Sequence, residues 1–265
     1  MTIVKGMRIR KGSWLILFVL LAAAYCLAGV EFVAQTRSDG GGDVTVHAYV
    51  SGVRAKVVFV ESQADDYAIG DYMLSPDEGK TLYLISPATK TYTKYDVPAM
   101  MAGMGGMVQG MRGMMKVNFE SPKIEKLLEE DGGLLAGLPT RHYRYRTSYT
   151  VTMHITGAKK VSTVMEEDIW TTDKLADPAL KVWLKQDPPS TGDAQVDKMI
   201  RAEMAKVEGF PLKRVTVTRT AGANGEHSSR SEMNVLEVKQ VRVPEAEFAM
   251  PRGYREVVPK RVIEE

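Results

Sequence analysis

Residues 138–155, "LPTRHYRYRTSYTVTMHI", decide the fold of this 265-residue chain. From residue 143 the odd positions are mostly tyrosine, valine, methionine and isoleucine, whereas the even positions from 142 are histidine, arginine, serine and threonine. This period of two predicts a β-strand with one apolar and one polar face. At about 3.3 Å per residue such a strand spans roughly 45 Å, which favours a large, curved sheet.

Shorter strands and tight turns surround this stretch. Between residues 30 and 95, turns such as "SDGGGD" and "SPDEG" separate alternating runs such as "VTVHAYV", which indicates an antiparallel meander. Further strands are predicted at 160–172, 210–220 and 229–243, and residues 116–133 fit a strand or a short helix. Two helices are expected, one opened by Asp177 and Pro178 and one beginning near Asp193 with an apolar stripe. The prediction is an α+β fold, a curved antiparallel sheet of about ten strands with helices on its concave side.

The first 28 residues have the pattern of a signal peptide. Four basic residues precede the uncharged run "WLILFVLLAAAYCLAG", which ends in small residues. The alternative is an uncleaved signal anchor that holds the protein at the membrane, and Tyr25 before Cys26 argues against a lipoprotein leader. Cleavage would remove four of the 35 Lys and Arg residues and none of the 33 Asp and Glu residues, leaving a formal charge of −2. We therefore expect a periplasmic or otherwise secreted protein and no nucleic-acid partner.

Catalytic and cofactor motifs are lacking in the sequence. The single cysteine lies in the leader, and the four histidines form no metal or nucleophile motif, so we interpret them as satisfied surface residues. "DEGKT" at 77–81 is interpreted as a hairpin turn rather than a phosphate loop, because Leu74 stands where that motif needs glycine. Adjacent acids at 129–131 and 166–168 would point to opposite faces of a strand. A binding protein without cofactor, rather than an enzyme, is the prediction.

Three motifs carry a family resemblance. They are "KTLYLISPATKTYTKYD" at 80–96, "LLAGLPTRHYRY" at 134–145 and "FAMPRGYREV" at 248–257. In their order and spacing they resemble uncharacterised secreted bacterial domains similar to the outer-membrane lipoprotein carrier and receptor (LolA/LolB-like) superfamily. The resemblance implies an unclosed half-barrel whose concave side is covered by helices and holds acyl chains. It also implies one domain over residues 29–258, followed by a short tail at 259–265.

An acyl-binding hollow needs a broad apolar lining. The apolar face of the long strand and the nearby tryptophans and methionines are candidates: Tyr145, Tyr149, Val151, Met153, Trp170, Trp183, Met199 and Met204. The alternative is that these side chains simply fill the core, because periodicity does not distinguish a filled barrel from a hollow one.

Residues 99–116 are rich in methionine and glycine. Their methionines recur at helical spacing and extend the candidate lining: Met100, Met104, Met107, Met111 and Met114. Five interspersed glycines would cost about 5 kcal/mol relative to alanine, so we expect a helix only where the methionine face meets an apolar surface. The alternatives are a loose loop, a flap over the hollow, or a Cu(I) site formed by Met104, Met107, Met111 and Met114.

Three functions remain open at this stage. The first is a cell-envelope protein that binds the acyl chains of lipids or lipoproteins, with membrane contact allowed. The second is a periplasmic sensor or scaffold that binds an envelope protein. The third is a methionine-rich Cu(I)-binding protein.

Overall fold

The computed structural model describes residues 29–39, 41–64, 67–115, 118–120, 122–154, 158–175, 190–206, 208–223 and 225–258. The predicted leader, the helix expected at 177, Trp183 and the C-terminal tail lie outside these residues. None of the helices within them is long and apolar enough to cross a membrane.

The first half of the chain is an antiparallel meander, as predicted. Each strand pairs with the next one along the chain. The strands are β1 (Gly29–Ser38), β2 (Val44–Ser51), β3 (Arg54–Ser62), β4 (Tyr72–Ser75), β5 (Thr81–Ser86) and β6 (Thr91–Asp96). The "DEGK" sequence lies in the turn between β4 and β5, where Glu78 and Gly79 both have positive φ, which confirms the hairpin.

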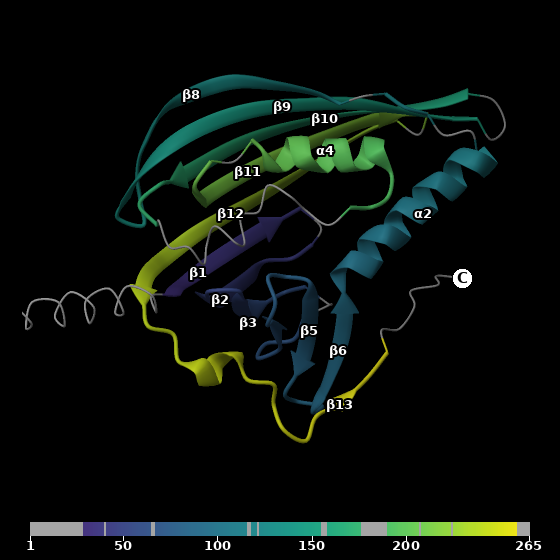
Figure 1. Ribbon diagram of the computed structural model, residues 1–265. Helices are drawn as coiled ribbons and strands as arrows, with labels where there is room; N and C mark the ends of the chain where they lie inside the picture. The colour runs from purple at the N-terminus through teal and green to yellow at the C-terminus, as the bar shows by residue number, and fades with distance from the viewer. Residues whose placement is uncertain are drawn as a thin grey trace, which may run out of the picture.

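The second half of the chain forms longer strands. They are β7 (Asn118–Phe119), β8 (Lys123–Leu135), β9 (Leu138–His154), β10 (Ala158–Thr172), β11 (Phe210–Gly222) and β12 (Gly225–Val241). β1 pairs with β12, so the two halves join into one sheet of 13 strands within the described residues. One edge is at β6 and β13 and the other at β7 and β8, so the curved sheet is unclosed (Figure 1).

One strand departs from the predicted all-antiparallel sheet. β13 (Arg255–Glu256) pairs in parallel with β6, after the short 3-10 helix η1 (Glu245–Phe248). A segment that returns along the edge of a sheet can pair in either direction. Turn patterns in the sequence therefore do not predict whether this pairing is parallel or antiparallel.

The strand β9 has the two faces that its alternation predicts. Tyr143, Tyr145 and Thr147 are buried, whereas Arg144 and Arg146 are exposed. Tyr143 and Tyr145 pack with Ile169 of β10 in one apolar cluster. A larger cluster lies where β1 meets β11 and β12, around Val30, Leu212 and Val235.

The helix α4 (Ala194–Met204) lies on the concave side of the sheet, beneath β9 to β12 (Figure 1). It begins where the sequence predicts, because Asp193 is its N-cap and accepts hydrogen bonds from the backbone of Gln195 and Val196. Beyond its C-terminal end, Lys206 reaches the buried Glu167 of β10 at 2.8 Å. The concave position of this helix confirms the prediction.

The methionine- and glycine-rich segment is a helix, α2 (Val97–Met115). Asp96 caps it by accepting a hydrogen bond from the Ala99 amide at 2.9 Å. Because α2 connects β6 with β7, it runs from one edge of the open sheet to the other (Figure 1). The loop alternative is therefore wrong. Of the methionines on the predicted face, Met100 and Met107 are exposed, whereas the side chains of Met111 and Met114 lie outside the described residues.

A close backbone approach fixes α2 against the turn before α4. A Cβ atom on Gly105 would lie 1.8 Å from the Thr191 carbonyl oxygen, so only glycine fits at this point. One turn further on, Gln109 Nε2 donates a hydrogen bond to the Gly192 carbonyl oxygen at 3.2 Å. By contrast, a Cβ on Gly103, Gly106 or Gly110 would meet no atom within 4 Å.

This difference between neighbouring glycines gives a matched test. Gly106→Ala should stabilise α2 by up to about 1 kcal/mol, because alanine loses less backbone freedom in a helix and meets open space. Gly105→Ala should instead push α2 away from the 190–192 turn and loosen it. Hydrogen–deuterium exchange over residues 97–115 measures both effects. Equal protection in the two variants would contradict the close approach.

Candidate ligand-binding site

An apolar pocket of about 310 Å³ lies between α2, α4 and β9. Its lining comes from these three elements and from the segment between β7 and β8: Met104, Val108, Glu120, Pro122, Tyr149, Val151, Gln195, Val196 and Met199. Pockets that bind small molecules typically measure about 300–1,000 Å³, so this one suits a slender ligand or part of a longer one.

The spacing of the lining residues along each strand and helix places their side chains on one face of that element. Tyr149 and Val151 are alternate residues of β9 and so point to its concave face. Val196 and Met199 are three residues apart on α4, and Met104 and Val108 are four apart on α2, so each pair shares one face of its helix. The pocket is thus a space between one sheet face and two helix faces.

Few polar groups reach this lining. Glu120 is exposed, and its carboxylate lies 3.8 Å from the Lys160 ammonium, which is also exposed. Gln195 lies at the N-terminal end of α4 and has a polar partner. The pocket therefore offers mainly dispersion contacts and burial of apolar surface, and it has a charged pair near one side.

The turn before α4 is held by a carboxylate. Asp197 accepts hydrogen bonds from the Ser190 hydroxyl and from both the amide and the hydroxyl of Thr191. These bonds lower the pKa of Asp197 from 3.8 to about 2, with the Ser190 hydroxyl as the largest cause. Because Thr191 also contacts Gly105, this carboxylate fixes the turn on which α2 rests.

A buried ion pair holds the other end of α4. Lys206 Nζ donates to Glu167 Oε2 at 2.8 Å and to the Thr147 hydroxyl at 2.6 Å. Glu203 of α4 also accepts a hydrogen bond from Lys206. The side chains of Lys206 and Glu167 are only 2% and 8% exposed, so the Glu167 carboxylate depends on Lys206 for a compensating charge. The helix is therefore fixed to the preceding turn at its N-terminal end and to the sheet beyond its C-terminal end, and the pocket lies toward its first turns.

The structure brings together four of the candidate lining residues. Met104, Tyr149, Val151 and Met199 line the pocket. Tyr145 is on the same face of β9 but belongs to the filled cluster with Tyr143, and Met153 and Met204 are half-buried outside the pocket lining.

The remaining candidates do not line the pocket or are not described. Trp170 lies on the opposite face of the sheet, because it pairs with His142 rather than with a residue of the tyrosine face. Met100 and Met107 are exposed on α2. The side chains of Met111 and Met114 lie outside the described residues, so the Cu(I) site stays a prediction.

Sequence reasoning missed Val108, Pro122, Glu120 and Gln195 as lining residues. Val196 had a usable signal, because it begins the apolar stripe of α4. Pro122 and Glu120 had none, since they lie in an irregular segment that only the pairing of β7 and β8 with β9 brings beside Tyr149.

A second hollow, of about 460 Å³, lies near the other end of β9. Acidic and basic side chains line it, including Asp131, Arg141, Asp173, Lys174 and Glu208. Burial of an apolar chain there would desolvate these charges, so this hollow does not suit a lipid tail. Among the described residues, no three His, Cys, Asp or Glu side chains lie close enough to hold a metal ion.

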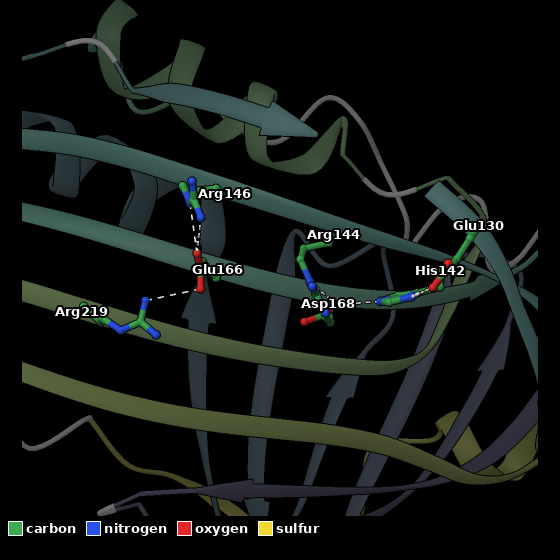
Figure 2. A network of polar contacts seen from close by, with 7 residues as sticks. All are labelled: Glu130, His142, Arg144, Arg146, Glu166, Asp168 and Arg219. Carbon is green, nitrogen blue, oxygen red and sulfur yellow. Dashed lines mark hydrogen bonds and ion pairs between the residues drawn. The ribbon is translucent and has the colours of Figure 1, made fainter. Parts of the chain in front are cut away.

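The convex face of the sheet carries paired charges. Figure 2 shows Glu166 between Arg146 and Arg219, at 2.8 and 3.4 Å. The hydrogen bond from Arg146 is the main reason why the pKa of Glu166 lies below its ordinary value. Next to it, Asp168 accepts from Arg144 at 2.8 Å. Neighbouring strands thus supply the carboxylates that neutralise these arginines.

His142 belongs to the same network and corrects one interpretation. Its ring nitrogens lie 3.0 Å from Glu130 and 2.7 Å from Asp168, and its ring stacks on Trp170 with centroids 4.1 Å apart. It is satisfied, as predicted, but it is buried rather than on the surface. The stacked indole covers it, which a strand pattern does not reveal.

A comparison with protein-family models matches part of the chain. A family model described as a domain of unknown function (DUF4412) matches residues 151–254, which include α4 and β10 to β12. The comparison with curated proteins gave no match.

Two solved structures are similar to the chain at 11% identity. An uncharacterized conserved protein from Thermus thermophilus has a TM-score of 0.38, covering 93% of this chain and 99% of that one. A LolA superfamily protein from Nitrosomonas europaea has a TM-score of 0.26, covering 88% of this chain and 97% of that one.

The Asp197 contacts predict a specific pH dependence. Because the pKa of Asp197 is lower in the folded chain, its contribution to stability is present above about pH 4 and is lost as the pH falls toward about 2. Asp197→Asn should therefore lower the free energy of unfolding at neutral pH and flatten its decline in acid. Urea unfolding of both proteins across this range measures the difference. Parallel pH curves would exclude this role.

The buried ion pair predicts a large effect of a single substitution. Lys206→Met should destabilise the fold by about 3–5 kcal/mol, because it leaves the Glu167 carboxylate buried without its cation. Adding Glu167→Gln should recover part of this loss, since the uncompensated charge is removed. Denaturant unfolding gives both values. Equal stability of the single and double variants would show that Glu167 is not buried in its charged form.

Proposed function

We propose that this protein is an exported binding protein of the bacterial cell envelope that holds an acyl chain of a lipid or lipoprotein. The pocket between α2, α4 and β9 carries the proposal. Its lining is mainly methionine, valine, proline and the ring of a tyrosine, and an acyl chain gains free energy from burial against such side chains. The leader pattern of residues 1–28 supports the cellular location.

The shape of the pocket favours a chain over a compact ligand. Two helices and a strand meet there at their apolar faces, so the lining follows the elements rather than converging on a few polar groups. A ligand recognised through hydrogen bonds would need several buried donors or acceptors at fixed positions. The exposed ion pair of Glu120 and Lys160, by contrast, could stay in water at the rim of the pocket, beside a lipid headgroup.

Binding rather than catalysis is also part of the proposal. Two buried carboxylates fix the position of α4. Asp197 holds the turn that precedes the helix, and Glu167 pairs with Lys206 beyond its C-terminal end. On the convex face, His142, Asp168 and Glu166 are engaged in ion pairs between strands. These groups do not border the apolar pocket.

A charge placed in the lining tests the proposal. Met199→Glu should weaken binding of a fluorescent fatty acid by about tenfold or more, because the bound chain would desolvate the new carboxylate. Ala194→Glu is the matched control, since residue 194 is exposed on the same helix and lies outside the lining. Titration of the probe, and mass spectrometry of lipids extracted from the purified protein, give the measurement. A wild-type chain that binds no acyl probe and carries no lipid would overturn the proposal.

A further inference from the structure

The helix α2 presents an apolar stripe to solvent. Met100, Met104 and Met107 follow one another at spacings of four and three residues, which places them on one side of the helix. They are 55%, 47% and 66% exposed. Three large apolar side chains in a row on one helix form a contiguous patch, which on a protein surface marks a site of interaction.

The contacts on the other side of α2 hold this stripe outward. Gly105 lies against the Thr191 carbonyl oxygen, and Gln109 donates to Gly192. Rotating the helix to bury Met100 and Met107 would break both contacts. It would also turn bulkier residues toward the 190–192 turn, where a single Cβ already clashes. Exposure of the stripe is therefore imposed by the packing of the helix.

The stripe is continuous with the pocket. Met104 belongs to both, because it lines the pocket and is still half exposed. An apolar chain that lies along Met100 and Met107 would meet the pocket at Met104 without crossing a polar surface. The helix also connects β6, near one edge of the unclosed sheet, with β7 at the other (Figure 1).

The charge of the segment indicates which surface fits. From residue 97 to residue 119 the sequence has no Asp or Glu, and its only charged residues are Arg112 and Lys116. An apolar stripe in a cationic segment is the pattern of helices that lie in the interface of a bilayer with anionic lipids. Two copies of the chain meeting through this segment would instead bring like charges together. Flexible methionine side chains adapt to an irregular lipid surface.

We infer that α2 is a docking helix for an anionic lipid surface and that Met100, Met104 and Met107 enter the headgroup region. Docking through the stripe would place Met104, and with it the pocket, at the bilayer. The purpose of docking rests on the proposed function, because docking would bring the acyl-binding pocket to the bilayer. The docking itself does not depend on that function.

Vesicle binding tests the docking. All described elements lie within residues 29–258, so the chain from residue 29 onward avoids the apolar leader and keeps the sheet. It should co-sediment with vesicles of phosphatidylcholine and phosphatidylglycerol, and less with phosphatidylcholine alone. The double variant Met100→Gln/Met107→Gln should reduce partitioning about tenfold or more, because two exposed apolar side chains are lost from the contact.

A matched control uses exposed leucines elsewhere. Leu134 of β8 and Leu236 of β12 are 72% and 55% exposed, and neither belongs to α2. Leu134→Gln/Leu236→Gln should leave vesicle binding unchanged. If both double variants lose it equally, binding reflects general surface hydrophobicity and the inference fails.

Other outcomes separate this inference from the proposed function. Met100→Gln/Met107→Gln should still bind a soluble fatty-acid probe, because neither residue lines the pocket. If the wild-type chain binds vesicles through the stripe but binds no acyl probe, docking stands and the proposed function falls. Absence of vesicle binding overturns the inference. The inference is also overturned if the wild-type chain forms a concentration-dependent dimer that Met100→Gln/Met107→Gln abolishes, since the stripe would then bind a second copy of the chain.

Discussion

The pairing of β1 with β12 is the constraint on which the rest of the structure depends. It runs in register from Gly29 opposite Val241 to Ser38 opposite Ser231, with a single bulge after Val33. Without it the two meanders would be separate sheets, each with an apolar face open to water. With it they form one sheet that curves around a shared concave side and leaves free edges only at its two extremes. The helix α2 spans the open side between those edges because it connects β6 to β7.

Strand alternation then distributes the chemistry between the two faces. The run Glu166, Glu167 and Asp168 shows this most directly. The first and third residues point outward to Arg146, Arg219 and His142, whereas the second points inward to Lys206. Exposed ion pairs contribute little each, about 0–1 kcal/mol. The buried pair instead makes the position of α4 specific, because the Glu167 carboxylate would be buried without a cation if Lys206 were removed. On the concave face, apolar residues line a pocket at the end of β9 that α4 reaches with its first turns.

Sequence patterns predicted the parts of this arrangement that depend on neighbouring residues. The period of two in β9, the hairpin turns and the Asp193 cap each report a local interaction, and each is confirmed. The candidate site was predicted only in part. Tyr149 and Val151 line the pocket whereas Tyr145 fills the core, although all three share one face. What separates them is the placement of α4 and α2 over the strand, which long-range contacts decide. Trp170 shows the same limit, since its face follows from its register with His142 rather than from its own hydrophobicity.

Packing geometry explains one of the glycines in α2 and leaves three others without a structural explanation. Gly105 is required by the close approach to Thr191, whereas Gly103, Gly106 and Gly110 meet open space, and their cost to the helix is not offset by any packing advantage within the described residues. Among the described residues of this helix, Gly105 and Gln109 hold it against the 190–192 turn. That turn is in turn held by Asp197. The chain of contacts from Asp197 through Thr191 to Gly105 therefore couples the first turn of α4 to the helix that covers one side of the pocket. Disrupting any of these contacts would therefore weaken the packing of α2 beside Tyr149 and Val151.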